Sequence, residues 1–197
     1  MANTLIINDS PKIKNSASSV LIDMLCSQIN ETTDIISIHF NNFKTNFGTL
    51  WNKYKKVVIC APLYADGLPS HLLEALTINE KSIHPSTHIY AIINCGLVEG
   101  IHAKQALDII RNFALRCHCI YAGGIGIGGC GGLYEMKEKN ILKLFSRKIN
   151  RKMNEFAQIV HSDKQTPNIY TKIGFTRILY KIIANFDWRK RIQKAKQ

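Results

Sequence analysis

Hydroxyl-bearing residues gather in one short stretch near the start of the chain, at residues 8–19. The stretch follows an apolar run and leads into a predicted helix, whose unpaired first N–H groups and dipole suit a phosphate. It matches neither the Gly-Lys-Ser/Thr of a Walker loop nor a Gly-x-Gly-x-x-Gly motif. The alternative is that Asn15 or Ser16 merely caps the helix. The residues that could bind the phosphate are Ser10, Lys12, Ser16 and Ser18.

A second loop combines an aromatic residue with turn formers. Residues 61–70 read Ala-Pro-Leu-Tyr-Ala-Asp-Gly-Leu-Pro-Ser, which indicates a rigid series of tight turns. Tyr64 could stack on a flat ring, and exposed backbone amides could hydrogen-bond to the heteroatoms of that ring. The alternative is a plain turn in which Pro69 starts a helix.

Two further loops follow apolar runs. In residues 94–102 the glycines permit close backbone approach to a ligand, and Glu99 and His102 could exchange protons. An exposed first-turn position is the simpler interpretation of His102, and Cys95, which lacks an evident base, is expected to have a packing or backbone role.

Seven of the ten residues 123–132 are glycine. Core strands and helices disfavour glycine, so we expect a ligand-wrapping loop or a lid there, with a glycine-rich linker as the alternative.

Five short apolar runs alternate with amphipathic segments. They predict strands over 4–8, 34–39, 57–61, 89–94 and 119–122. Helical spacing predicts helices over 16–29, after Pro69, over 103–115 and over 137–160. Apolar strands separated by helices indicate a doubly wound α/β fold with a parallel sheet covered on both faces. In such sheets ligands bind at the carboxyl ends of the strands, where all four loops lie.

The composition is that of a globular domain: 197 residues, 46% hydrophobic and 20% charged. No apolar stretch is long enough to span a membrane and no secretory signal is evident, so we expect a cytoplasmic protein. The six cysteines form no Cys-x-x-Cys pair, so we expect buried free thiols and no metal site. Cys117-x-Cys119 is too sparse for an iron–sulfur cluster.

The net charge of +12 is concentrated in the tail, where residues 164–197 contain nine basic residues and one acidic residue. We expect a domain over 1–161 and an extension over 162–197. In the extension, residues 162–170 predict a linker, and residues 173–196 predict a basic amphipathic helix. Such a helix suits an anionic membrane surface, a partner subunit or the core of its own chain; no nucleic-acid-binding motif accompanies it. Its apolar stripe would comprise Phe175, Ile178, Leu179, Ile182, Ile183 and Phe186.

Together these motifs resemble the flavodoxin-like NADPH-dependent FMN reductases, in particular a bacterial, clostridial-type subgroup. The resemblance covers roughly residues 3–160 and rests on Ser10-Pro11-Lys12 with Asn15-Ser16-Ala17-Ser18, on residues 62–69, on Asn94-Cys95-Gly96 and on the glycine run. It implies a three-layer sandwich with a five-stranded parallel sheet in the order 2-1-3-4-5, followed by a C-terminal helical extension.

The resemblance also implies roles for individual residues. The FMN phosphate would be held by Ser10, Lys12, Ser16, Ala17 and Ser18. The isoalloxazine ring would be bordered by Pro62, Leu63, Tyr64, Asp66 and Gly67, and Asn94, Cys95 and Gly96 would contact its other side or its pyrimidine edge. Asp9 stands where the family usually has glycine. A carboxylate beside a phosphate is unfavourable unless it points away or is paired.

The implied activity is that of an FMN-dependent NAD(P)H oxidoreductase. Bound flavin would take a hydride and pass it to a small acceptor such as a quinone, an azo or nitro compound, or free flavin, with no strict need for a side-chain acid or base. Family members are commonly homodimers. The alternative is a flavodoxin-like module for binding or electron transfer, tethered by its tail to a membrane or partner. Electron-carrier flavodoxins are typically acidic, and the charge of +12 argues against that role.

Overall fold

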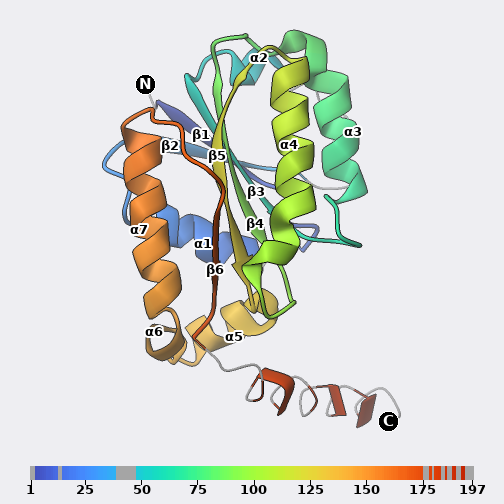
Figure 1. Ribbon diagram of the computed structural model, residues 1–197, viewed down its shortest axis with the longest axis vertical. Coiled ribbons are helices and arrows are strands. Elements are labelled where there is room, and N and C mark those ends of the chain that lie inside the picture. The colour runs from blue at the N-terminus through green and yellow to red at the C-terminus, as the bar shows by residue number, and fades with distance from the viewer. Residues whose placement is uncertain are drawn as a thin grey trace.

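The computed structural model describes residues 3–12, 15–38 and 48–174, and in the C-terminal segment residues 178, 180–182, 185, 188, 189, 192 and 193 (Figure 1). Over these residues the chain forms one parallel sheet in the order β2-β1-β3-β4-β5-β6. The strands are β1 (Thr4–Asn8), β2 (Thr33–Ser37), β3 (Lys56–Pro62), β4 (His88–Asn94), β5 (Ile120–Gly128) and β6 (Ile169–Lys172). The predicted order of the first five strands is confirmed.

The expected number of strands is wrong, because β6 adds a sixth strand beside β5. It begins within residues 162–170, which the sequence predicts to be a linker. Its sequence, Ile-Tyr-Thr-Lys, is only half-buried along its whole length. A buried strand is recognised from a continuous apolar run, and this edge strand has none.

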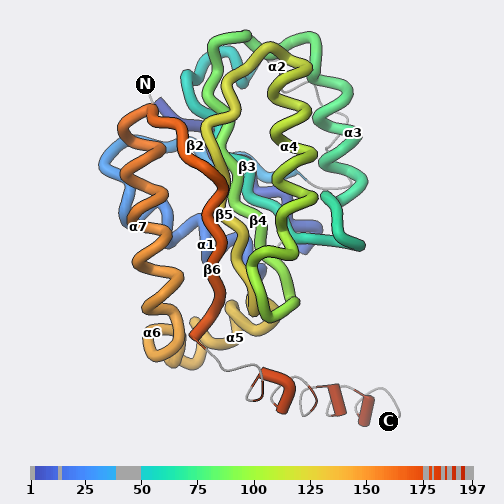
Figure 2. The backbone as a smooth tube through the Cα atoms, in the orientation of Figure 1, coloured from blue at the N-terminus to red at the C-terminus, as the bar shows by residue number. Residues whose placement is uncertain are grey.

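Helices cover both faces of the sheet, which confirms the expected three-layer α/β architecture (Figures 1 and 2). The helices α1 (Ala17–Cys26) and α7 (Arg147–His161) pack on one face, against side chains such as Ile6 and Val58. The helices α3 (Ser70–Asn79) and α4 (Lys104–Arg116) pack on the other, against Leu5 and Val57. Neighbouring residues of a strand point to opposite faces, so a run such as Leu-Ile-Ile supplies both cores.

The long helix expected over 137–160 is divided into α5 (Leu133–Glu138), α6 (Leu142–Phe145) and α7. Asn140 adopts a left-handed conformation with φ of 55° just after α5. The N–H of Ile141 donates to the carbonyl oxygen of Met136 at 3.0 Å, which satisfies an open carbonyl at the end of the helix. Asparagine tolerates this conformation better than most residues, so it can end a helix that apolar spacing alone would continue.

Most of the glycine run is not the loop or lid that we expected, because residues 123–128 belong to strand β5 and only residues 129–132 follow it. A Cβ atom on Gly126 would lie 2.6 Å from the carbonyl oxygen of Gly100, and one on Gly128 would collide with the carbonyl oxygen of Val98. The loop after β4 therefore passes directly over the sheet here. Glycine is required by this close approach rather than by a mobile segment.

The described residues of the C-terminal segment are mostly helical, and Ile178, Ile182, Trp188 and Ile192 among them are exposed. Four residues of the predicted apolar stripe lie outside the described residues: Phe175, Leu179, Ile183 and Phe186. Within the part of the chain that the structure describes, no helix has both the length and the apolar character needed to cross a membrane.

A short helix, α2 (Gly48–Trp51), precedes β3.

Candidate functional site

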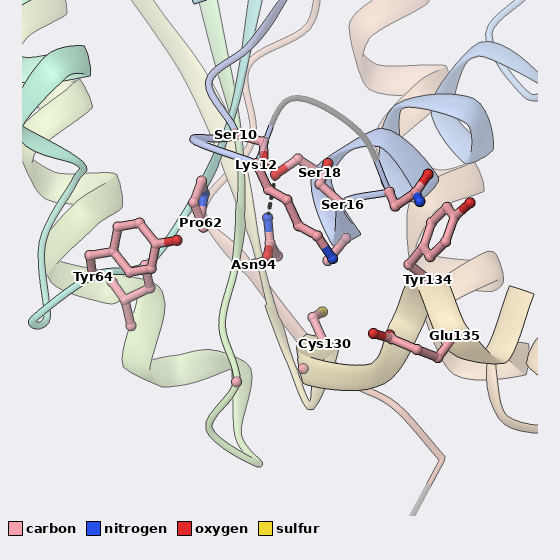
Figure 3. A pocket seen from close by; sticks show the side chains of 15 residues that line it. Ser10, Lys12, Ser16, Ser18, Pro62, Tyr64, Asn94, Cys130, Tyr134 and Glu135 are labelled. Atoms are coloured by element: carbon pink, nitrogen blue, oxygen red, sulfur yellow. Dashed lines mark hydrogen bonds between the residues drawn. The ribbon is translucent and has the colours of Figure 1, made fainter. Parts of the chain in front are cut away.

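The carboxyl ends of β1, β3, β4 and β5 enclose a cavity of about 220 Å³, hereafter the carboxyl-end pocket (Figure 3). Most of the residues that the sequence analysis selected line it: Ser10, Lys12, Ser16, Ala17, Ser18, Pro62, Leu63, Tyr64, Asn94 and Gly96. In Figure 3 the serines and Lys12 lie in the middle of the pocket, with Tyr64 to one side and Tyr134 to the other. Segments far apart in the sequence therefore meet at the edge of the sheet where a parallel α/β fold binds its ligands.

The start of α1 is built to present polar hydrogens to this pocket. The hydroxyl of Ser16 caps the helix by accepting from the N–H of Ser19 at 3.1 Å, so the capping interpretation holds. The backbone N–H groups of Ala17 and Ser18 have no acceptor among the described residues. Capping and anion binding are thus compatible, because one side chain satisfies only one of the open N–H groups of the first turn.

Asn94, at the end of β4, ties three elements together beneath the pocket. Its side-chain amide donates to the hydroxyl of Ser18 at 2.9 Å and to the carbonyl oxygen of Ala61 at 3.1 Å. Asn94 and Ser18 are both buried. Since buried polar groups are costly when unpaired, these bonds fix the start of α1 against the ends of β3 and β4. These bonds therefore join α1, β3 and β4 at the floor of the pocket.

Asp9 points away from the pocket, which resolves how a carboxylate can precede the serine loop. The side chain is fully buried, and its Oδ1 atom lies 3.0 Å from Nε2 of the buried His71 in α3. The Asp9 backbone N–H donates to the carbonyl oxygen of Cys60 at 2.9 Å. Burial raises the pKa of Asp9 to about 8. The carboxyl group thus lies against His71 below the loop and does not line the phosphate end of the pocket.

The Tyr64 loop is a two-residue hairpin. Tyr64 and Gly67 exchange backbone hydrogen bonds of 3.0 and 2.8 Å. Between them Ala65 and Asp66 both have positive φ, 45° and 58°, as in a type I′ turn. Asp66 and Gly67 therefore do not line the pocket, whereas the ring of Tyr64 is held at its margin and is 52% exposed.

Cys95 does not line the pocket either. Its thiol donates to the carbonyl oxygens of Leu97 and Glu99, and burial raises its pKa. A thiol that stays protonated is a poor nucleophile, which agrees with a packing role. Glu99 forms an ion pair with Lys172 at 2.7 Å outside this pocket. All six cysteines are free and five of them are buried.

A further wall of the pocket comprises Cys130, Gly131, Tyr134 and Glu135, and Asn15 joins them at the serine loop. Cys130 and Gly131 belong to the glycine run, where a ligand-wrapping loop is expected, whereas Tyr134 and Glu135 are not among the predicted site residues. Tyr134 and Glu135 lie in α5, directly after the glycine run, so an aromatic and an acidic residue beyond a strand end were the available signal. From the C-terminal segment, the Tyr180 hydroxyl donates to the carbonyl oxygen of Gly96 at the rim of the pocket.

No model of a protein family and no curated protein matches the sequence. Solved structures do match the fold. An azoreductase from Bacillus anthracis aligns with a TM-score of 0.57 and 12% identity over 82% of this chain and 100% of that one.

Two further structures extend this similarity. General stress protein 14 from Treponema denticola, in complex with FMN, aligns with a TM-score of 0.58 and 14% identity over 80% of this chain and 99% of that one. Oxidised flavodoxin 1 from Bacillus cereus aligns with a TM-score of 0.54 and 15% identity over 81% of this chain and 97% of that one. Together with the strand order, these matches show that the chain has the flavodoxin-like fold.

Proposed function

We propose that the protein is an FMN-dependent NAD(P)H oxidoreductase that reduces a small acceptor such as a quinone, an azo or nitro compound, or free flavin. The observation that carries the proposal is the meeting of the α1 N-terminus with the Tyr64 hairpin in one pocket. The first feature suits a phosphate and the second suits a flat ring, so the pocket has both halves of a site for a ring with a phosphate tail.

The residues present fit FMN on three counts. The N–H groups of Ala17 and Ser18 and the hydroxyl of Ser10 offer hydrogens to a phosphate, and Lys12 offers a charge. The one acidic residue of the serine loop, Asp9, is turned away from the pocket and lies against His71. Similar folds include an azoreductase and a protein solved with FMN, which supports the same assignment.

Bound FMN would supply the redox chemistry, accepting a hydride from a nicotinamide and releasing electrons to the acceptor. The chain itself binds and orients. Asn94 holds the end of β4 against Ser18, and this bond positions the backbone around Gly96 beside the site of the ring. The Tyr64 hairpin borders the site on the opposite side, where the exposed tyrosine ring could lie against a flat ligand.

An absorption spectrum of the purified full chain tests the proposal. We expect the yellow absorption of oxidised flavin, either as isolated or after addition of FMN, and anaerobic NADPH or NADH should bleach it. A colourless protein that takes up no added FMN would contradict the proposal. Bleaching by neither nucleotide would leave a flavin-binding module without turnover.

The exposed apolar residues of the C-terminal segment favour a second candidate, a tethering function of the tail. The exposed fractions are 74% for Ile178, 60% for Ile182, 66% for Trp188 and 50% for Ile192. Large apolar side chains with basic neighbours such as Arg189 suit an anionic lipid surface. Flotation with phosphatidylserine vesicles tests it: binding that is lost on truncation after residue 174 supports the tether, and unchanged binding contradicts it.

A further inference from the structure

A second cavity, of about 500 Å³, lies along the outer edge of β6 and shares no lining residue with the carboxyl-end pocket. We call it the basic cleft and define it by Glu99, Gly100, Ile101, Lys148, Arg151, Lys152, Tyr170, Thr171 and Lys172. Figure 1 shows β6 between α7 on one side and the loop leading to α4 on the other. The proposed flavin site uses none of these residues.

The cleft has an excess of positive charge that the described residues do not balance. Lys172 pairs with Glu99 at 2.7 Å, and Lys152 pairs with Glu155 at 2.6 Å. The remaining two cations, Lys148 and Arg151, are exposed and have no carboxylate within ion-pair distance in the part of the chain that the structure describes. Two unbalanced cations on one wall of a cleft attract a multiply charged anion.

The position of these cations carries an energetic cost. α7 begins Arg-Lys-Ile-Asn-Arg-Lys and has no acidic residue in its first turn. Cations near the start of a helix are opposed by its dipole, and like charges three or four residues apart repel each other. A bound anion would remove both penalties, which is the pattern expected where function overrides local stability.

The opposite wall of the cleft is aromatic and apolar. Tyr170 packs on the α4 side of the sheet while still bordering the cleft, and Ile101 beside it is 49% exposed. Gly100 brings the loop backbone against β6, where a Cβ atom would collide with the carbonyl oxygen of Thr171. A flat base could therefore lie on this wall while phosphates lie on the wall formed by α7.

We propose that the basic cleft binds a nucleoside diphosphate. Its two phosphates would lie against Lys148 and Arg151, and its base would lie against Tyr170 and Ile101. The assignment depends on the cleft alone and holds whether or not the carboxyl-end pocket takes FMN.

Calorimetric titration of the full chain with ADP tests the proposal, with inorganic pyrophosphate as the probe for phosphate binding alone. ADP should bind saturably at one site, and K148Q/R151Q should weaken binding at least about tenfold. The control K55Q/K81Q removes the same charge at exposed positions outside the cleft and should change the affinity little. K12Q, or saturation with FMN, should likewise leave ADP binding unchanged, since neither alters the cleft.

Equal ADP affinity in K148Q/R151Q and in the wild type would overturn the proposal. Loss of ADP binding in K12Q would also overturn it, by placing the nucleotide in the carboxyl-end pocket. Pyrophosphate that binds as tightly as ADP would contradict the nucleoside part, because the base would then contribute nothing. ADP that binds about tenfold more tightly than pyrophosphate, with the loss confined to K148Q/R151Q, would establish it.

Discussion

The carboxyl group of Asp9 lies 3.0 Å from Nε2 of His71, and both side chains are buried. Asp9 directly precedes the serine loop, and His71 lies in the first turn of α3, just after the Tyr64 hairpin. The pair therefore joins the segments that border the two ends of the carboxyl-end pocket. It also holds a carboxyl group below the loop, where it does not repel an anion.

The burial of Asp9 predicts a pH dependence of stability. Burial raises the pKa of Asp9 from 3.8 to about 8, so between these values the folded chain keeps a proton that the unfolded chain has lost. The free energy of unfolding should therefore fall as pH rises through this window and level off above about 8. D9N cannot titrate, so its urea midpoints should fall less over the same range. D66N, at an exposed turn, is the control, and wild-type and D9N curves of identical slope would contradict the prediction.

A second prediction concerns the glycines of β5. G126A should lower the free energy of unfolding by about 1–3 kcal/mol, because the new methyl group would lie 2.6 Å from the carbonyl oxygen of Gly100. G96A is the control: no atom lies within 4 Å of the site of its Cβ, so we expect little change. Urea denaturation of both variants measures the difference. Equal stability of the two variants would show that the loop after β4 does not press on the sheet.

The contrast between Gly126 and Gly96 shows which features of the fold the sequence can predict and which it cannot. Apolar runs identify β1, β3, β4 and β5 because a buried strand needs apolar side chains on both faces, and the rule for ligand sites then locates the pocket. The glycines of β5 have a cause that the local sequence does not show. Their cause is contact with Gly100 and Val98, which belong to another loop, and composition alone cannot separate close packing from flexibility.

The same limit applies to the candidate site. The orientation of Asp9 depends on His71, which is distant in sequence, so the local pattern of the serine loop cannot reveal it. Tyr134 lines the pocket from the first turn of α5, which follows the glycine run. Such contacts are set by tertiary packing. The sequence predicts the loops that meet and most of the residues that line the pocket, but it does not reveal that Asp66, Gly67 and Cys95 lie outside it.

A third prediction concerns strain in the Tyr64 hairpin. Ala65 has a φ of 45°, in the left-handed region that costs a residue with a Cβ atom roughly 1 kcal/mol or more. A65G should therefore raise the free energy of unfolding by about 0.5–1 kcal/mol, although the unfolded glycine chain gains entropy that offsets part of the effect. G67A is the control, since its Cβ would make only ordinary contacts at 3.8 Å and beyond. A lower melting temperature for A65G than for the wild type would contradict the strain argument.

The fourth prediction measures the phosphate end of the carboxyl-end pocket. S18A removes the hydroxyl that accepts from Asn94 at 2.9 Å and leaves a buried amide hydrogen unpaired, which costs about 1–3 kcal/mol. If that bond positions the start of α1, the dissociation constant for FMN should rise about tenfold, as measured by the quenching of flavin fluorescence.

K12Q should weaken FMN binding as well and should reduce its dependence on salt, because it removes a charge facing the phosphate. K53Q, an exposed lysine that precedes β3, is the matched control. FMN affinities that are equal in K12Q, S18A and K53Q would show that the phosphate does not bind at the start of α1.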